Sequence, residues 1–167
     1  TMRISAANYF PRLEVAGGVL IANHDQALGV SRVGDSGAPN RVTLAGGTLQ
    51  AGGADRSYGA EILLTAHSTI SGDEANLTLG GRITGADMNL LKAGTKTLTL
   101  SATNNAYGNT TISEGMLAIT NAGALPGWNT AGRYSVADGA TLAVGTGVLE
   151  AQVTAMLETG NFQAGSR

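Results

Sequence analysis

Apolar and polar residues alternate in short runs along this chain, and the alternation predicts β-strands. Between Lys96 and Ser101, for example, Leu98 and Leu100 alternate with threonines, which is the period of a strand with one buried face. The runs end at clusters of Asn and Gly residues, which adopt turn conformations readily. The pattern predicts strands near residues 13–15, 19–22, 41–45, 48–51, 61–65, 76–79, 82–84, 90–92, 97–100, 110–113, 116–120, 134–137 and 141–144.

The chain also resembles itself at a long interval. Identical residues occur at a constant offset of 97 positions (115 − 18) in four places: Gly18 and Gly115, Leu20 and Leu117, Ala27 and Ala124, and Leu28 and Leu125. Internal repetition of this kind indicates a repeat architecture. We therefore interpret the chain as a single domain with one full repeat at about residues 4–99 and part of a second at about residues 100–167.

A shorter spacing inside these repeats favours a β-helix. Leucines in glycine-flanked strands are separated by 29, 30, 19, 19 and 25 residues: Leu20, Leu49, Leu79, Leu98, Leu117 and Leu142. Steps of about 20 to 30 residues have the size of one coil of a parallel β-helix. Two-residue hairpin signals are scarce, since Asp138-Gly139 is the one clear case. The predicted fold is all-β, a right-handed parallel β-helix (β-solenoid) of about eight coils whose leucines stack about 4.8 Å apart. A β-sandwich is the alternative.

The C-terminal stretch departs from the strand pattern. Apolar residues recur there at roughly helical spacing: Val148, Leu149, Val153, Met156 and Leu157. Gly160-Asn161 follows as a stop signal, so a short helix is predicted over residues 149–158. This helix either caps the solenoid or is inserted into it.

The amino-acid composition limits the width of the hydrophobic core and the classes of function. The 25 glycines and only 4% aromatic residues indicate a thin core of Leu, Val, Ile and Ala, because few large rings are present to fill a wide one. A net charge of −2 without runs of Lys or Arg argues against nucleic-acid binding. The absence of cysteine excludes disulfides and thiolate metal sites.

No apolar stretch has the length of a transmembrane helix, and the first residues do not form a signal peptide. We therefore expect the chain to be a piece of a longer protein, with any export signal or membrane anchor outside it.

Residues 89–127 carry an ordered series of short motifs. The motif residues are Leu91, Lys92, Gly94, Leu98, Thr99, Leu100, Ser101, Asn105, Tyr107, Thr110, Thr111, Ile112, Gly115, Leu117, Ala124 and Leu125. In this order they resemble the autotransporter-associated β-strand repeat (passenger-associated repeat) of bacterial surface proteins. Two positions depart from the family phrase, because Asn109 replaces a glycine and Pro126 interrupts Ala-Leu-Gly.

The resemblance implies a structural role rather than an enzyme. It implies a passenger repeat segment of a bacterial cell-surface or secreted protein, located extracellularly or on the bacterial outer surface, that forms a rigid extended stalk or fibre. The expected partners are neighbouring repeats of the same polypeptide or other copies stacked end to end, with a host surface or glycan as a further candidate. No catalytic, cofactor-binding or metal-binding residues, no nucleic acid and no membrane insertion are expected. Phe162 to Gly165 also resembles a segment that follows a short helix in this family.

Two alternatives stay open, an adhesin and a fragment of a polysaccharide-degrading β-helix enzyme. For the enzyme, carboxylates recur at steps of 21, 20 and 19 residues, close to one coil: Glu14, Asp35, Asp55 and Glu74. Two of them side by side would serve a retaining glycosidase or bind Ca²⁺. The opposing interpretation is that they are ordinary turn residues, as is the pair Asp73-Glu74, because an acidic row without a cation repels itself.

Other residue types give weaker signals for chemistry. His24, next to Asp25, and His67 have no second histidine at metal-ligand spacing. The serines considered as nucleophiles lack the Gly-x-Ser-x-Gly context: Ser68, Ser71 and Ser113.

For the adhesin, the candidate surface is the loop at residues 31–40 together with Trp128, which is predicted to be the exposed aromatic contact. The other aromatic residues are too scattered to form a platform for sugars: Tyr58, Tyr107 and Tyr134. Asn76 and Asn109 match the glycosylation tripeptide, which carries little meaning in a bacterial protein. The remaining candidates are interpreted as corner residues that bind turn backbone or stack: Asn23, Asn104 and Asn121.

Overall fold

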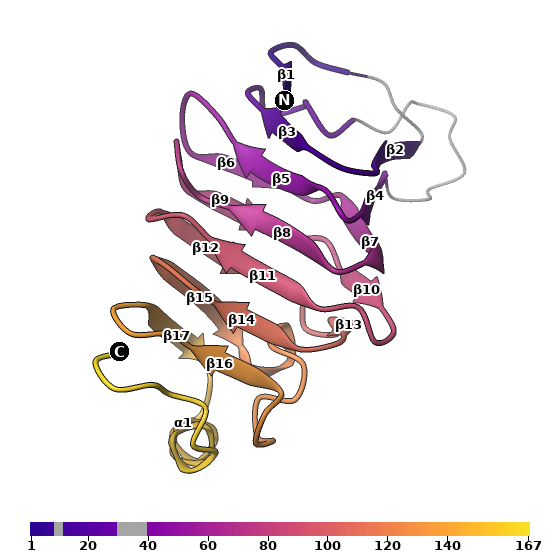
Figure 1. Cartoon of the computed structure of the whole chain (residues 1–167). Helices are drawn as coiled ribbons and strands as arrows, with labels where there is room; N and C mark the ends of the chain where they lie inside the picture. The colour runs from indigo at the N-terminus through magenta and orange to yellow at the C-terminus, as the bar shows by residue number, and fades with distance from the viewer. Residues whose placement is uncertain (9–11, 30–39) are drawn as a thin grey trace.

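Three parallel β-sheets wind around one thin core in this protein, whose structure is a computed structural model that describes residues 1–8, 12–29 and 40–167. The chain passes from sheet to sheet and returns to the first sheet one coil further on, so it forms a β-solenoid of about six turns (Figure 1). This arrangement confirms the predicted β-helix over the β-sandwich, with fewer coils than expected.

The sheets are named A, B and C. Sheet A contains, in order, β1 (Met2–Ile4), β3 (Val19–Ala22), β5 (Thr48–Ala51), β8 (Ser68–Ser71), β11 (Leu90–Ala93), β14 (Thr110–Ile112) and β16 (Tyr134–Val136). Sheet B contains β2 (Arg12–Val15), β4 (Arg41–Ala45), β7 (Glu61–Ala66), β10 (Ile83–Gly85) and β13 (Ala106–Tyr107). Sheet C contains β6 (Arg56–Tyr58), β9 (Leu77–Leu79), β12 (Thr97–Leu100), β15 (Met116–Asn121) and β17 (Thr141–Gly147). A 3₁₀ turn, η1 (Ala122–Ala124), follows β15, and helix α1 (Glu150–Glu158) follows β17.

The predicted strands agree with these bounds to within one residue at every end except that of β17, which continues to Gly147. Four short strands were not predicted: β1, β6, β8 and β13. They are two to four residues long, too short for a clear alternation, and neighbouring strands supply their hydrogen bonds; β8, for example, lies between β5 and β11. The predicted loop at residues 31–40 lies outside the described residues except for Asn40.

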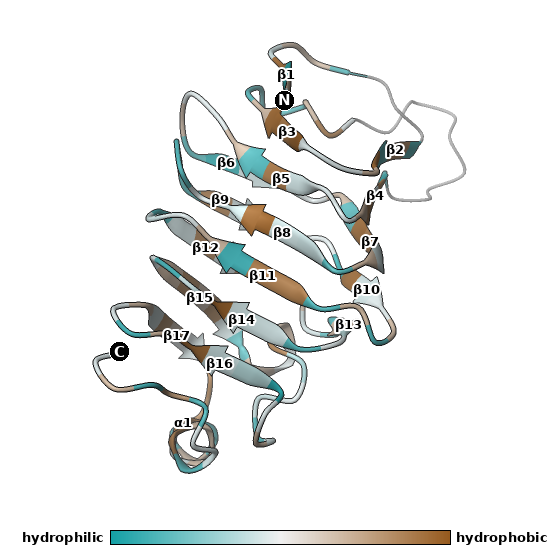
Figure 2. Ribbon diagram, in the orientation of Figure 1, coloured by the Kyte–Doolittle hydropathy of each residue, from teal (hydrophilic) through white to brown (hydrophobic). Residues whose placement is uncertain are grey.

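Ladders of aliphatic side chains make up the core. One ladder of register partners in sheet C consists of Leu77, Leu98, Leu117 and Leu142. Leu98 and Leu117 therefore lie one coil apart, as predicted. Figure 2 shows hydrophobic residues along the strands and hydrophilic residues at many of the corners between them, with a hydrophilic end on β11.

The predicted equivalence of the six leucines needs one correction. Leu20 does lie opposite Leu49 in sheet A. Leu79, however, belongs to sheet C and lies opposite Leu100. Spacing alone places a residue in a coil but does not say which of the three sheets it belongs to.

The long internal repeat pairs residues that lie in different sheets. Leu20 lies in β3 of sheet A, whereas Leu117, 97 positions later (117 − 20), lies in β15 of sheet C. The unit of the fold is therefore the single coil, and the division into residues 4–99 and 100–167 stays a prediction.

Helix α1 begins at Glu150 and ends at Glu158, which confirms the predicted helix. After it, Phe162 forms a parallel bridge with Val136 of β16, so the chain returns to sheet A. Because the chain returns to sheet A after the helix, α1 is better described as an insertion into the solenoid than as its cap.

Candidate functional site

The described members of the predicted row of carboxylates, Glu14, Asp55 and Glu74, do not stack on one another. Glu14 in β2 lies opposite Thr43 of β4, so no acidic residue stacks on it in the next strand of sheet B. Asp35 lies outside the described residues. Asp55 binds Asn76, whereas Glu74 binds Arg3.

Asp55 begins a ladder of polar side chains at a corner. Its two carboxylate oxygens accept the backbone N–H and the Nδ2–H of Asn76, both at 2.9 Å. Asn76 Oδ1 accepts in turn the N–H of Thr97, at 2.9 Å. The side-chain hydrogen bond from Asn76, and then its backbone hydrogen bond, lower the pKa of Asp55. Asp55 is therefore an ionised residue that holds successive coils in register.

Glu74 forms a two-pronged ion pair with Arg3, from the first strand of the chain. The Nη1 and Nη2 atoms of Arg3 donate to its two carboxylate oxygens at 3.0 and 2.6 Å. This hydrogen bonding lowers the pKa of Glu74. The neighbouring carboxylate of Asp73 accepts a hydrogen bond from Ser71 Oγ. The acidic pair is thus part of a turn.

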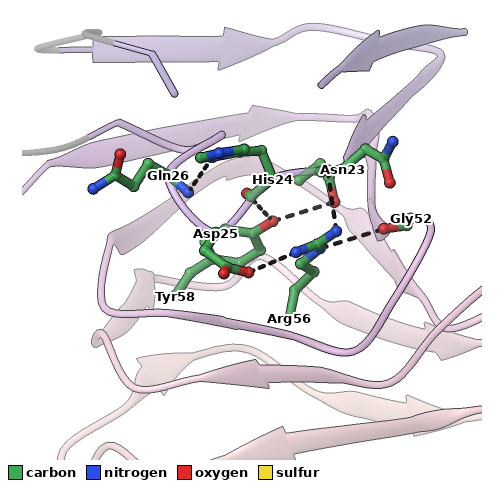
Figure 3. Close-up of polar contacts among 8 residues, drawn as sticks. Asn23, His24, Asp25, Gln26, Gly52, Arg56 and Tyr58 are labelled. Carbon is green, nitrogen blue, oxygen red and sulfur yellow. Dashed lines mark hydrogen bonds and ion pairs between the residues drawn. The ribbon is translucent and has the colours of Figure 1, made fainter. Parts of the chain in front are cut away.

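A polar cluster fixes the first corner between sheets A and C (Figure 3). Residues 23–28 form a turn where a further coil of sheet C would lie, and sheet C begins with β6. Arg56 of β6 binds this turn: Nη1 donates to Asp25 Oδ1 at 2.6 Å and Nη2 donates to the Asn23 carbonyl oxygen at 3.1 Å. A third bond, from Nε, reaches the Gly52 carbonyl oxygen at 3.4 Å. The guanidinium thus joins two coils.

Tyr58 completes this cluster. Its hydroxyl donates to the carbonyl oxygens of Ala22 and His24, at 3.2 and 2.9 Å. Burial raises its pKa to about 12, so the phenol stays protonated at neutral pH. His24 Nδ1 accepts the N–H of Gln26. Arg56, Tyr58 and His24 therefore bind backbone, which makes the cluster a structural clamp. The Oδ1 atom of Asn23 is the exception in this cluster, because it is buried without a hydrogen-bond partner.

Replacing Arg56 by alanine is expected to lower the free energy of unfolding by about 2 kcal/mol, because two carbonyl oxygens and a carboxylate lose their donor. The matched control is Arg41→Ala. Arg41 is half exposed and lies 3.3 Å from Glu61, so its loss should cost less than about 0.5 kcal/mol. Urea titration of both variants measures the difference, and equal losses would contradict the clamp.

Lys92 is a buried charged residue, although nothing in the strand pattern predicted its burial. It lies in β11 between Ile70 and Ile112 in register, and it is 0% exposed. Its Nζ donates to three carbonyl oxygens, those of Ala93, Gly94 and Glu114, at 2.8, 2.6 and 3.0 Å. All three ammonium hydrogens are thereby used, and they join the corners of two successive coils.

Burial lowers the pKa of Lys92 to about 8, although the nearby carboxylates of Glu114 and Asp73 oppose the shift. Below about pH 8 the amine is protonated in both the folded and the unfolded chain. Between about pH 8 and its ordinary pKa of 10.5, the folded protein releases a proton that the unfolded chain keeps. The contribution of Lys92 to folding therefore becomes more favourable as the pH rises.

The free energy of unfolding of the wild-type chain, minus that of Lys92→Met, is accordingly expected to rise by about 1 kcal/mol from pH 7 to pH 9. Subtracting the variant removes the titration of all other groups. Denaturant titration at several pH values measures the difference. A flat or falling difference would mean that the three carbonyl oxygens keep the ammonium charged in spite of its burial.

The remaining histidine and two of the three candidate serines, Ser68 and Ser113, also bind backbone. His67 Nδ1 accepts the N–H of Asn89 at 2.9 Å, and Ser68 Oγ donates to the Ala66 carbonyl oxygen. Ser113 Oγ donates to the carbonyl oxygen of Lys92. Among the residues that the structure describes, no three or more His, Cys, Asp or Glu side chains gather as a metal site would require.

The aromatic residues contribute to the core. Three of the four tyrosines are at most 4% exposed: Tyr58, Tyr107 and Tyr134. The Tyr107 hydroxyl accepts a hydrogen bond from Thr110 Oγ1, and burial raises its pKa to about 12. Trp128 is partly buried and packs against the core, so only part of its side chain is exposed, and its role as the contact of an adhesin stays a prediction.

Asn105, and not its neighbour Asn104, has the predicted role of a corner residue whose side chain binds backbone. Asn105 is 8% exposed; its Oδ1 accepts the N–H of Ile83, and its Nδ2 donates to the Ala124 carbonyl oxygen. Asn121, as predicted, binds turn backbone, since its Nδ2 donates to the Ser101 carbonyl oxygen. The signal for Asn105 was present in the motif Asn-x-Tyr.

Two hollows on the described surface lack the groups of a glycosidase. One, of about 270 Å³, lies between β1, β2 and β3 and contains a single carboxylate, that of Glu14. The other, of about 260 Å³, lies on sheet A beside His67 and Asn89 and contains none.

Comparison with known families gives one match. Residues 90–119 match the family described as Passenger-associated-transport-repeat, which confirms the resemblance for this stretch. This repeat family is not catalytic by itself, and it implies a secreted or surface-exposed protein. Neither a curated protein nor a solved structure matches the chain. In the described residues, no helix combines the length and the apolar character needed to cross a bilayer.

Proposed function

Because residues 90–119 are a passenger-associated-transport repeat, we propose that this protein is a rigid, extended passenger segment on the outer surface of a bacterium or secreted from it. The observation that carries the proposal is the coincidence of the repeat with one closed circuit of the solenoid. The matched residues run from β11 in sheet A, through sheets C and B, back to sheet A and on into β15. One family unit is thus one coil together with its contact to the next.

Rigidity follows from side chains that join successive coils. Lys92 binds two corners within the repeat, Asn105 binds the coils on either side of it, and Asp55 binds the next corner. About six turns at a rise of about 4.8 Å give a rod of roughly 30 Å. A solenoid of this kind gains stability from each added neighbour.

The partners in this proposal are further coils, either neighbouring repeats of the same polypeptide or copies stacked end to end. Both ends of the described solenoid support it. Met2 in the first strand is 57% exposed and Val144 in the last is 40% exposed, although both stand in line with core residues. Stacking would remove this apolar surface from water.

Surface display tests the proposal. The chain, with an epitope tag at its N-terminus, is fused to an outer-membrane translocator in a laboratory bacterium. We expect the tag to be accessible to antibody on intact cells and the solenoid to resist added protease, because its backbone is hydrogen-bonded between coils. A tag that stays inaccessible, or a displayed chain that protease removes rapidly, would contradict the proposal.

The same cells separate the two alternatives. Specific attachment to immobilised glycans or matrix proteins, absent from cells that display the tag alone, would replace the structural role by that of an adhesin. Release of reducing ends from a polysaccharide, lost in Asp55→Asn, would replace it by an enzyme.

A further inference from the structure

The outer face of sheet A carries a hollow in the middle of the solenoid. It has a volume of about 260 Å³ and lies over β8, β11 and β14. These three strands lie side by side, and each has a neighbouring strand of sheet A on both of its sides (Figure 1). The hollow therefore does not depend on where the solenoid begins or ends.

Alternation along the strands creates the hollow. Ser68 and Leu90 are register partners, and their side chains are buried. Because successive side chains point to opposite faces of a strand, only the backbone of these two residues faces outward, and it forms the floor. The residues that flank them in the chain form two walls.

The first wall consists of His67 and Asn89, at the corner between sheets B and A. His67 Nδ1 accepts the N–H of Asn89 at 2.9 Å, so the neutral ring carries its hydrogen on Nε2. Asn89 Oδ1 accepts the N–H of Asn109 at 2.8 Å, which leaves its two Nδ2–H groups for a ligand. The acceptor atoms of this wall are thus used between coils, and the wall offers donors.

The second wall has an apolar centre. Leu91 is the register partner of Thr69 in β8 and of Thr111 in β14. Its side chain is half-buried, and the two threonines lie on either side of it along the hollow. The wall therefore offers a small apolar surface between hydroxyl groups that can donate and accept hydrogen bonds.

The chemistry of the two walls selects a neutral ligand. Among the described residues that line the hollow, none is Asp, Glu, Lys or Arg. A ligand that matches both walls has an acceptor for the N–H donors, an apolar group for Leu91 and hydroxyl groups for the threonines. An N-acetylhexosamine has all three, in the carbonyl oxygen and the methyl group of its acetamido substituent and in the hydroxyl groups of its ring.

We propose that this hollow binds one N-acetylhexosamine unit of a glycan, with the acetamido carbonyl oxygen at His67 and Asn89 and the acetamido methyl group on Leu91. The inference goes beyond the proposed function, because it gives a ligand to the side of a structural segment. The hollow is open to solvent, so we expect a dissociation constant of about 1 mM for one unit. A site of this strength is not expected to hold a cell on an immobilised glycan, so the attachment of cells still separates the structural role from an adhesin.

Titration of the purified chain with two sugars tests the site. Methyl N-acetyl-β-glucosaminide is the probe, and methyl β-glucoside, which has a hydroxyl group in place of the acetamido group, is the matched control. Chemical shifts of the backbone amides measure binding. We expect saturable shifts that are largest at residues 67–69 and 89–91. The glucoside should bind at least about fivefold more weakly, because it lacks the carbonyl oxygen and the methyl group.

Tri-N-acetylchitotriose distinguishes two sources of the same sugar. Binding tighter than that of the methyl glycoside identifies an interior unit of a linear glycan, and equal binding identifies a single terminal unit. Saturable shifts at the same residues support the site in both cases.

Two variants of the hollow locate the binding. Asn89→Asp keeps an oxygen that accepts the N–H of Asn109 but removes both Nδ2–H donors. Leu91→Thr gives this position the residue found at both neighbouring positions of its row, so the sheet should accept it. Each variant should weaken binding of the probe at least about fivefold.

Leu63→Thr is the matched control. Leu63 is also a half-buried leucine on an outer face, and its register partners are also threonines, Thr43 and Thr84 of sheet B. This change should leave the affinity within about twofold. A denaturation midpoint and an amide spectrum like those of the wild type show that a variant is folded. If one of the two hollow variants does not fold, the other decides.

Three results would overturn the inference: shifts that do not saturate, equal binding of the two methyl glycosides, or binding that the folded hollow variants leave unchanged. Surface display is a separate test, since an accessible tag and resistance to protease do not depend on sugar binding. A displayed chain that does not bind the sugar removes this site alone. A chain that binds the sugar but is not displayed removes the proposed function alone.

Discussion

Replacing Lys92 by alanine is expected to lower the free energy of unfolding by about 3–5 kcal/mol. Two effects act in the same direction. The substitution removes a side-chain stem that is packed between Ile70 and Ile112 in the core ladder of sheet A. It also leaves the carbonyl oxygens that accepted the three ammonium hydrogens without a donor.

Lys92→Met is the control that separates these effects. Methionine keeps an aliphatic stem of similar length but carries no donor, so this variant should recover the packing part of the loss alone. Urea titration monitored by circular dichroism measures both variants against the wild-type chain. An alanine variant as stable as the wild type would show that the corner needs neither the stem nor the ammonium group.

Gly115→Ala is the second change with a large expected effect, a loss of at least about 3 kcal/mol. Gly115 has φ +65°, a conformation that a side chain disfavours. A Cβ atom would also lie 2.5 Å from the Gly94 carbonyl oxygen and 2.7 Å from the Thr95 carbonyl carbon. Both neighbours are backbone atoms of the preceding coil, so neither can move without shifting the register.

Gly139→Ala isolates the conformational part of this loss. Gly139 has φ +74°, and a Cβ atom there would meet no atom within 4 Å. It should therefore cost only the strain of the backbone, about 1–2 kcal/mol. Thermal unfolding of both variants measures the difference. If the two losses were equal, close packing of the corners would not contribute to the stability of the solenoid.

These two residues give a physical role to two positions of the motif in residues 90–119. Lys92 and Gly115 lie within the matched stretch, one in β11 and the other at the corner before β15. The lysine donates to the corner that Gly115 adjoins, through the Glu114 carbonyl oxygen. The repeat therefore contains both the donor that joins two coils and the glycine that lets them approach.

The candidate polar residues were harder to predict than the fold. Asp55 and Asn76 are 21 positions apart, which is one coil, and they do stack. The spacing therefore identified a ladder, but it assigned the next position to Glu74, which instead pairs with Arg3. A difference of two residues moves a side chain to another part of the corner, so spacing cannot choose between neighbours there.

By itself, the sequence determined that this chain forms short parallel strands around a thin aliphatic core, because alternation with a period of two and glycine-rich turns depend only on neighbouring residues. It also determined a helix at residues 149–158, which the structure forms from Glu150, and a family resemblance at residues 89–127, which the family model matches over residues 90–119. Only the tertiary structure decided which sheet each strand joins, since β3 and β15 share a motif but lie in different sheets. It likewise decided that Lys92 is buried, because a lysine on a strand can face either side until three carbonyl oxygens from two coils surround its amine.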